Sequence, residues 1–282
     1  IVMVELKHLQ DFCFGSRQSR SSSFDIGYMA NVLPYEGGFI GVSRTGATNQ
    51  DDNVAILRLN KDFEIVEEEN VTKGEDSRSF FYKNQAFALT WDPHRDSNGA
   101  WVFSYKVINL KTKKVTTLSI DKFPVTKVEV LGKNWIPLVK NDILYFVVTV
   151  EPNLCMIRCN LDTGECVWET PIPFIEDSLH ITSSRGGTPF IFHKPTKRFI
   201  GLGHRTHNCH YHSPFLYSMD SNFEDIYIGE DIDMKFSGVG DPLSIYEEKG
   251  KLYCCVAHFP IQLGDTCEAH SSLYEIQIGK VK

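Results

Sequence analysis

Charged and polar side chains gather at the starts and ends of short apolar segments, where they could act together on one ligand. Arginine and lysine bind anions such as phosphate through charge-assisted hydrogen bonds, and a carboxyl group beside them can supply a proton. At the starts of segments lie Asn31, Glu75, Asp76, Arg78, Lys133, Asn134, Arg185 and Asp241. At the ends of the following segments lie Arg44, Trp91, Asp92, His204, Arg205 and His258.

Two interpretations of this set stay open. The cationic side chains could form a local anion site in an acidic chain, or they could pair with the carboxylates as a structural network. Asp76 could accordingly be a strand-initiating carboxylate paired with Arg78, and His204 an ordinary, partly buried histidine. The choice depends on whether the fold brings these positions to one place.

The elements that would position these residues are β-strands. Short runs rich in Val, Ile, Phe, Tyr and Thr recur between turn residues, and amphipathic helical patterns are almost absent, which is typical of an all-β protein. The runs come in sets, and equivalent first-run positions recur at intervals of roughly 45 to 58 residues, as expected for propeller blades with variable loops. These positions are Asn31, Asp76, Asn134, Thr188 and Asp241.

The pattern therefore predicts an all-β fold in which residues 1–282 form a single five-bladed β-propeller domain. Its blades are expected at approximately 26–70, 75–120, 130–171, 182–230 and 238–282 plus 1–7. The fifth set lacks a clear fourth strand, and the alternating stretch Val2–Leu6 could supply it, which would close the ring and remove an exposed edge. The alternative is a pair of β-sandwiches, although these do not require second strands that repeatedly end in polar groups.

The composition of the chain argues against some classes of binding partner. The formal net charge is -7, which argues against a general binder of nucleic acid or anionic membranes, because such proteins need a cationic surface. No apolar run approaches the ~18 residues of a membrane-spanning helix, and no targeting segment is apparent. We expect a soluble protein without membrane insertion or nucleic acid, whose compartment is open and for which an oligomer is possible.

The eight cysteines show no regular disulfide framework. The spacing of Cys155, Cys159 and Cys166 could suggest a metal, but a paired Cys-x-x-Cys arrangement is missing, so buried or unpaired thiols are the expectation.

A histidine-rich segment also has two interpretations. His204, His207, His210 and His212 surround Cys209 and could hold a metal or form a polar loop at the propeller mouth. We expect the polar loop and no metal, because spacing fixes no carboxylate or cysteine partner.

Several segments resemble one family in the order of the blades. Gly74–Arg78 (GEDSR) is similar to the Glu-Asp-Pro-Arg motif of the β-mannoside phosphorylase and hydrolase family, glycoside hydrolase family 130. Lys133–Trp135 followed by Leu144–Phe146 resembles that family's third blade, and Arg185–Pro189 followed by Leu202–His204 resembles its fourth. Each motif alone is commonplace, but the order and spacing agree across nearly the whole chain.

The resemblance implies an inverting reaction at the anomeric carbon of a sugar in a β-mannoside-like oligosaccharide. It makes Asp76 the general acid, whose pKa should be raised so that it holds a proton for the leaving oxygen. Inorganic phosphate is the possible co-substrate, with no other cofactor expected, and its ligands would be Arg78, Arg185 and His204. The implied substrate-binding residues are Asn31, Arg44, Glu75, Lys133, Asn134, Tyr211, Asp241 and His258.

The chain departs from the family at two of these places. Ser77 stands where the family usually has proline, and His258 replaces a substrate-binding aspartate. Phosphorolysis is preferred over hydrolysis, because a cationic pair is visible and a second carboxylate placed to activate water is not. A glycosyltransferase that uses an activated sugar donor and a non-catalytic carbohydrate-binding propeller are the alternatives.

Overall fold

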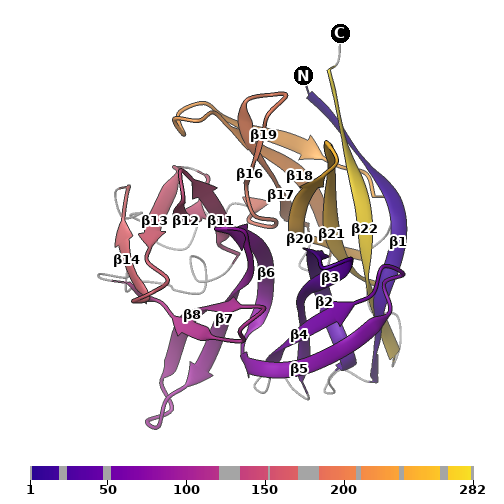
Figure 1. The fold of residues 1–282 in the computed structure, drawn as a ribbon, viewed down its shortest axis with the longest axis vertical. Coiled ribbons are helices and arrows are strands. Elements are labelled where there is room, and N and C mark those ends of the chain that lie inside the picture. The colour runs from indigo at the N-terminus through magenta and orange to yellow at the C-terminus, as the bar shows by residue number, and fades with distance from the viewer. Residues whose placement is uncertain are drawn as a thin grey trace.

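Strands joined by tight turns make up most of the chain in the computed structural model (Figure 1). The described part of the chain forms strands β1 to β22 and contains no helix. It comprises residues 2–18, 24–46, 52–120, 134–151, 153–170, 184–207, 211–234, 238–260 and 266–280. No helix within these ranges is long and apolar enough to cross a membrane.

Hydrogen bonding groups the strands into sheets of 13, 5 and 4 strands. In chain order the strands form five consecutive sets with mainly antiparallel pairing, which are the blades of a five-bladed β-propeller and confirm the predicted fold. Blade 1 consists of β2 (Phe24–Tyr35), β3 (Gly38–Gly46), β4 (Asn53–Leu59) and β5 (Ile65–Lys73). Blade 2 consists of β6 (Glu75–Tyr82), β7 (Gln85–Arg95), β8 (Trp101–Asn109) and β9 (Val115–Thr117).

The remaining blades follow the same plan. Blade 3 consists of β11 (Ile136–Lys140), β12 (Ile143–Thr149), β13 (Cys155–Cys159) and β14 (Glu165–Trp168), with β10 (Ser119–Ile120) parallel to β14. Blade 4 consists of β15 (Ser184–Arg185), β16 (Ile191–His193), β17 (Arg198–His207), β18 (Tyr211–Met219) and β19 (Ile226–Asp231). Blade 5 consists of β20 (Gly238–Glu248), β21 (Lys251–Pro260), β22 (Thr266–Lys280) and β1 (Val2–Gln18).

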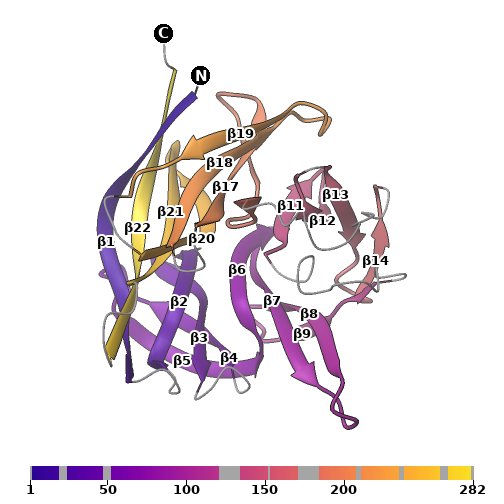
Figure 2. The same cartoon turned by 180° about the vertical axis from the view of Figure 1, so that it is seen from behind.

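The N-terminal strand supplies the outer strand of blade 5, as predicted. β1 runs antiparallel to β22 from Val2 opposite Lys280 to Gln18 opposite Thr266, so the pairing is longer than the predicted stretch. The two termini therefore lie side by side, and β6 and β20 lie toward the middle of the ring (Figure 1 and Figure 2). Single pairings also connect β1 to β2 and β18 to β20, so blades 4, 5 and 1 form one continuous sheet.

A repeated side-chain turn connects the third and fourth strands in four blades. In each, a side-chain oxygen accepts hydrogen bonds from backbone N–H groups two to five residues later. The residues are Asn60, Asn109, Asn160 and Asp220. Asn and Asp favour turns because their short side chains bond to the backbone nearby, so these residues end the third strand at the same point of each blade.

Apolar clusters between neighbouring blades hold the ring together. Leu89 of blade 2 and Phe146 of blade 3 belong to one cluster, whereas Leu138 of blade 3 and Phe215 of blade 4 belong to the next. Each fully buried side chain of this kind contributes about 1.5–3 kcal/mol. The core is therefore distributed between the blades, which leaves the strand ends near the axis available for polar groups.

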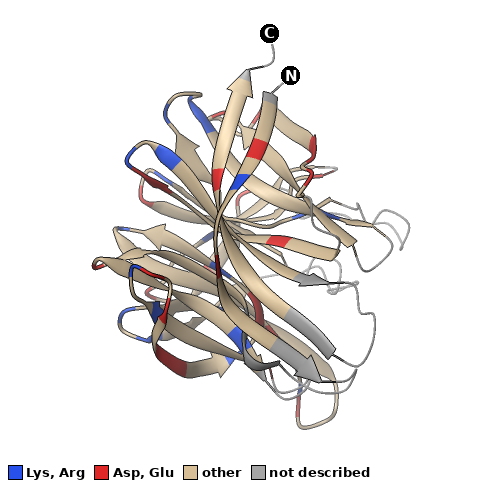
Figure 3. Cartoon of the chain, turned by 90° about the vertical axis from the view of Figure 1, so that its right-hand side faces the viewer, with Lys and Arg blue, Asp and Glu red and all other residues tan. Residues whose placement is uncertain are grey.

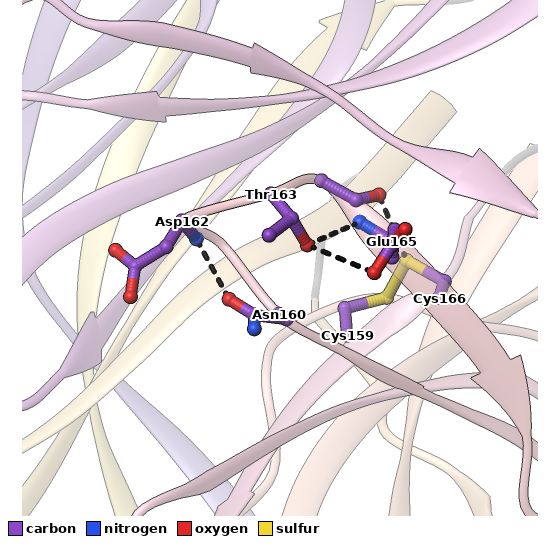
Figure 4. Close-up of a disulfide and its surroundings, with 7 residues drawn as sticks. Cys159, Asn160, Asp162, Thr163, Glu165 and Cys166 are labelled. Atoms are coloured by element: carbon purple, nitrogen blue, oxygen red, sulfur yellow. Dashed lines mark hydrogen bonds between the residues drawn. A yellow bond between two sulfur atoms is a disulfide. The ribbon is translucent and has the colours of Figure 1, made fainter.

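One cysteine prediction was wrong. Cys159 and Cys166 form a disulfide across the β13–β14 hairpin, where they are directly opposed, and Figure 4 shows it beside the Asn160 turn. Sequence spacing alone did not reveal this bond because it depends on the hairpin register. The cysteines that are free and buried in the described chain are Cys13, Cys155, Cys254 and Cys255.

Candidate functional site

The start of β6 places Glu75 and Asp76 at the inner edge of blade 2. Asp76 has a φ of 52°, and the β6–β7 pairing is irregular between Glu75 and Arg78. Gly74 precedes them with a φ of 154°, and a Cβ there would lie 2.5 Å from the Thr90 hydroxyl oxygen. Asp is among the residues that tolerate the left-handed region best, so this segment can present two consecutive carboxylates where a regular strand could not.

Arg44, near the end of β3, collects three carboxylates. Its Nη2 lies 2.5 Å from Glu75 Oε2, its Nη1 lies 3.3 Å from Asp76 Oδ1, and it also forms an ion pair with Asp52. All four side chains are only about one-tenth exposed. One guanidinium group therefore neutralises only part of the negative charge around it, and the cluster joins blades 1 and 2 at the predicted site.

Arg78 connects three blades from a fully buried position. Its Nε donates a hydrogen bond to the Gly187 carbonyl oxygen at 3.0 Å, and its Nη2 donates to Asn134 Oδ1 at 2.6 Å. Its Nη1 donates to the backbone oxygen of Asp76. Burial lowers the pKa of Arg78, although Asp76, Asp241 and Glu75 oppose that shift. This geometry makes Arg78 a positioning residue for Asp76, and its role toward phosphate stays a prediction.

Asn31 and Asn134 also position their neighbours. Asn31 is fully buried, its Nδ2 donates to the Ser77 carbonyl oxygen at 3.0 Å, and its Oδ1 accepts from the Ser79 N–H at 2.8 Å. These bonds tie β2 to β6 on both sides of Arg78. Asn134 has a φ of 66° and holds the Arg78 guanidinium. Direct contact of either amide with a sugar stays a prediction.

A second polar group forms where blade 4 meets blade 5. His204 on β17, His212 on β18 and Asp241 on β20 are brought together there, and the two imidazole rings stack with centroids 4.9 Å apart. His212 Nδ1 donates to Asp241 Oδ1 at 2.6 Å, while His204 Nε2 lies 3.8 Å from the same oxygen. His204 and Asp241 were predicted from the sequence as site residues, whereas His212 was considered only as part of the histidine-rich segment.

Burial sets the protonation of this group. It lowers the pKa of His204 to about 4, because Asp241 offsets the desolvation only partly and His212, Arg78 and Arg185 add to it. Burial also acts to raise the pKa of Asp241, but His204 and the hydrogen bond from His212 outweigh it, and the pKa lies below its usual value. At neutral pH the group thus contains a neutral His204 and an ionised Asp241.

Arg205 and Arg185, which lie near His204, differ in the contacts that their side chains make. Arg205 forms an ion pair with Asp231 at 2.5 Å and lies over the Phe215 ring at 4.2 Å. Arg185 lies opposite His204 in the β15–β17 pairing. Toward other described residues its side chain makes no hydrogen bond or ion pair, and its role toward phosphate stays a prediction.

Three other predicted residues have different side-chain partners or lie outside the described residues. Tyr211 begins β18, is 36% exposed, and has its ring centroid 5.7 Å from that of His207. His258 is buried in β21, with its Nε2 2.9 Å from the Tyr274 hydroxyl oxygen. Lys133 lies outside the described residues. Their contact with substrate stays a prediction.

A row of aromatic rings extends from the site along the β7–β8 hairpin. Trp135, next to Asn134, stacks on Tyr105 at 3.6 Å. Trp91 stacks on Phe103 at 5.7 Å, and Phe103 on Trp101 at 6.3 Å. Trp91 and Tyr105 are cross-strand partners, so the rings share one face of the sheet. The row ends at Trp101, which is 48% exposed and lies under the Arg95 guanidinium.

Asp52 is the carboxylate that sequence reasoning missed. It lies just before β4, and its backbone oxygen accepts a hydrogen bond from the Gly74 N–H at 3.1 Å. The available signal was weak, because Asp52 follows another aspartate in a polar stretch that reads as an ordinary loop. Its contact with Arg44 depends on the register of β3 and β4, in which Arg44 lies opposite Val54.

A separate cavity of about 560 Å³ lies between blades 2 and 3. It is lined by the far ends of their strands and by turns, including Lys83, Asp142 and Asp162. None of the predicted site residues lines it. Because β6 begins at Glu75 and ends at Tyr82, the cavity belongs to the opposite end of the blade from the candidate site.

Comparison with known proteins finds similarity of fold alone. No protein-family model and no curated protein sequence matches the chain. An α-L-arabinofuranosidase from Podospora anserina in complex with cellotriose has a TM-score of 0.61 at 8% identity, covering 95% of this chain and 96% of that one.

Two phosphorylases have similar structures. A β-1,2-mannobiose phosphorylase from Listeria innocua has a TM-score of 0.56 at 10% identity, covering 88% of this chain and 89% of that one. A mannose phosphorylase from Leishmania mexicana in complex with a phosphate ion has a TM-score of 0.54 at 12% identity, covering 94% and 88%. At such identities these likenesses show a shared fold, found in both glycoside hydrolases and phosphorylases.

Proposed function

We propose that this chain is a carbohydrate-active enzyme that cleaves a glycosidic bond with inversion at the anomeric carbon. The observation that carries the proposal is the clustering of Glu75, Asp76 and Asp52 around Arg44 at the inner edge of the blades. Glycosidic cleavage requires a carboxyl group that donates a proton to the leaving oxygen. Propellers that share this fold include enzymes of this chemistry.

Asp76 is proposed as the general acid. It lies beside Glu75 at the inner edge of blade 2, and both carboxylates contact Arg44. As the general acid, Asp76 would hold the proton that the leaving sugar oxygen needs. The bonds from Arg78 to the Asp76 backbone and to Asn134 hold the acid in place without depending on the proline that the family motif usually contains.

Arg185 is proposed as the main ligand of inorganic phosphate, which would attack the anomeric carbon. Its support is the position beside His204 and the resemblance of Arg185–Pro189 to the phosphorylase motif. The bond between the anomeric carbon and the leaving oxygen breaks, a new bond to a phosphate oxygen forms, and Asp76 protonates the leaving group. The products are a sugar 1-phosphate and a shortened oligosaccharide.

Hydrolysis is the second candidate, and Asp52 favours it. The preference for phosphorolysis rested on the lack of a visible second carboxylate, whereas the structure adds Asp52 beside Asp76 through Arg44. A second carboxylate can activate water instead of leaving the attack to phosphate. Membership of glycoside hydrolase family 130 and a β-mannoside substrate remain part of the proposal and rest on the motif resemblance.

Product analysis tests the proposal. The protein is incubated with manno-oligosaccharides, and separately with xylo- and cello-oligosaccharides, each with and without inorganic phosphate. Sugar 1-phosphate that forms only with phosphate supports phosphorolysis, and shortening without phosphate supports hydrolysis. A parallel incubation with sugar nucleotides detects transfer, which would replace the proposal with the glycosyltransferase alternative.

Two variants assign the activity to the cluster. Asp76→Asn keeps the size of the side chain but removes its proton, so turnover should fall by about 10²–10⁴-fold. Asp62→Asn, in the exposed turn after β4, is the matched control and should retain activity. Binding of oligosaccharide without any turnover by the unaltered protein would instead indicate a non-catalytic propeller.

A further inference from the structure

The group formed by His204, His212 and Asp241 has the composition of a metal site. One imidazole nitrogen from each histidine and one carboxylate oxygen lie within 4.8 Å of one another. The three residues come from adjacent strands of blades 4 and 5, and β18 pairs with β20 at His212 opposite Val239. Paired strands hold these side chains more firmly than a loop would.

The distances between the three ligand atoms can be compared with those expected around one metal ion. Metal–ligand bonds to imidazole and carboxylate are about 2.0–2.2 Å long, so ligand atoms around one ion lie roughly 3–3.5 Å apart. The His212–Asp241 distance of 2.6 Å is shorter and the His204–Asp241 distance of 3.8 Å is longer. The ligand atoms of His204 and His212 lie within 4.8 Å of each other, so side-chain rotations would have to adjust all three separations when an ion binds.

His204 has an incomplete set of partners in this arrangement. Its side chain is 3% exposed, its Nε2 is too far from Asp241 for a hydrogen bond, and its buried Nδ1 has no hydrogen-bond partner in the described chain. Burying an imidazole in this way is costly without a compensating interaction. An ion bound at Nε2 would give this ring a strong partner on the side that faces Asp241.

Positive charges near the proposed site lower the affinity that we expect for a metal ion. Arg78 and Arg185 lie close enough to His204 to act on its pKa, and their positive charges oppose a bound cation. Asp76 and Glu75 act on Arg78 in the opposite direction. We therefore expect weaker binding than in a structural zinc site with four protein ligands.

We propose that His204, His212 and Asp241 bind a divalent transition-metal ion, with Zn²⁺ as the expected occupant. Two imidazole nitrogens suit zinc and related metals, whereas Ca²⁺ and Mg²⁺ prefer oxygen ligands. Three protein ligands also leave a fourth position open, as in zinc sites that bind a water or a substrate group. The proposal does not depend on the glycosidic activity proposed above.

The test is direct metal binding to the full chain after chelator treatment and dialysis. Isothermal titration with zinc chloride should show one bound equivalent, and saturating zinc should raise the melting temperature. Calcium and magnesium chloride should do neither at the same concentrations. Absence of stoichiometric zinc binding, or equal binding of calcium at this site, would overturn the proposal.

Three variants and a matched control locate the ion. His204→Ala, His212→Ala and Asp241→Asn should each weaken zinc binding by at least about tenfold. His207→Ala removes a neighbouring histidine that pairs with Asp231 at 2.9 Å and is 41% exposed, and it should bind zinc as the unaltered chain does. Equal loss in His207→Ala and His212→Ala would reject the assignment.

Cobalt substitution covers the case in which a variant fails to fold. Addition of Co²⁺ to the unaltered chelator-treated chain should produce the visible absorption of a low-coordinate nitrogen and oxygen site, and zinc should abolish it. A spectrum like that of hydrated Co²⁺ would count against the site. Because these measurements need no sugar, their outcome is separate from the turnover of Asp76→Asn.

Discussion

Arg44 carries the positive charge on which the acidic side of the candidate site depends. Its ion pairs with Glu75, Asp76 and Asp52 are largely shielded from water, and removing one partner of a buried pair leaves uncompensated charge. The Arg44 ion pairs thus stabilise the fold and also position the carboxylates of the candidate site. They keep three carboxylates together around one guanidinium group.

Arg44→Ala should lower the free energy of unfolding by about 2–4 kcal/mol, because three partly buried carboxylates lose their shared cation. Urea unfolding at neutral pH measures the effect. The control is Arg58→Ala, whose pair with Glu36 is exposed on both sides and should contribute less than about 1 kcal/mol. Equal losses in the free energy of unfolding would show that the Arg44 ion pairs stabilise the fold no more than an exposed pair does.

His258 is expected to make the folding stability of the protein fall at acidic pH. Burial, reinforced by His270, lowers the pKa of His258 to about 4, whereas an unfolded histidine titrates near 6.5. Between these values the unfolded chain binds the additional proton, so stability rises with pH. The contribution is fully present above about pH 6.5 and is lost as the pH falls toward 4.

His258→Gln should therefore flatten the pH dependence of stability. Relative to the variant, the unaltered chain should lose on the order of 3 kcal/mol between pH 7 and pH 4. Urea midpoints at several pH values measure the difference, and histidines common to both chains cancel from it. Parallel curves would mean that His258 titrates normally in the folded state.

The β7–β8 hairpin is the element that most clearly extends the candidate site. Its aromatic row begins beside Asn134 and ends at the exposed Trp101. Flat rings offer rigid apolar surface at little entropic cost, and the apolar faces of sugar rings can stack on such surfaces. If the substrate is an oligosaccharide, its distal units would follow this face.

Trp101→Ala should reduce affinity for longer oligosaccharides by about tenfold, or about 1.4 kcal/mol, while a disaccharide is bound as before. Titration calorimetry with a series of chain lengths measures this dependence. Phe81→Ala is the control, since Phe81 is 41% exposed near the opposite end of the same blade. A uniform loss for all lengths would reject the distal contact.

Element types could be predicted from the sequence because they depend on local signals. Alternating apolar runs indicated the strands, and turn residues such as Asn60 and Asn160 marked where third strands end. Closure by Val2–Leu6 could be anticipated because the fifth blade lacked a strand. These inferences require only neighbouring residues and the repeat.

Contacts between blades could not be predicted in the same way. Arg78 binds the Gly187 carbonyl across 109 residues, and this bond depends on strand ends from different blades. The Cys159–Cys166 disulfide depends on the register of the β13–β14 hairpin, and the Asp52–Arg44 pair depends on the register of β3 and β4. The sequence therefore indicated most of the site's residue types, but not the division between positioning residues and those open to ligands.

At the scale of the whole molecule, the ring is closed by pairing of the chain's two ends. β1 and β22 bring Val4 and Leu6 against the apolar cluster between blades 4 and 5. Charges of both signs are distributed over the outer strands and turns (Figure 3), so the cluster of buried charge near the axis is distinct from the surface pattern. Closure keeps the inner strands, and hence the site, in one arrangement.

Leu6→Asp should weaken ring closure, because it places a charge against that apolar cluster. We expect a loss of about 2 kcal/mol or more in the free energy of unfolding. Met3→Asp is matched in strand and charge, but Met3 is 53% exposed and its substitution should have little effect. Thermal unfolding of both variants measures the difference, and equal melting temperatures would argue against closure by β1.

The proposed role of Asp76 is to donate a proton to the leaving oxygen of a glycoside. Kinetic comparison of Asp76→Asn with the unaltered chain on two glycosides of the same sugar, an oligosaccharide and a dinitrophenyl glycoside, tests that role. A dinitrophenolate leaves without protonation. We predict that the variant loses about 10²–10⁴-fold in kcat/KM on the oligosaccharide but retains most of its activity on the dinitrophenyl glycoside. Equal losses on both substrates, or no loss on either, would contradict the assignment of Asp76 as the general acid.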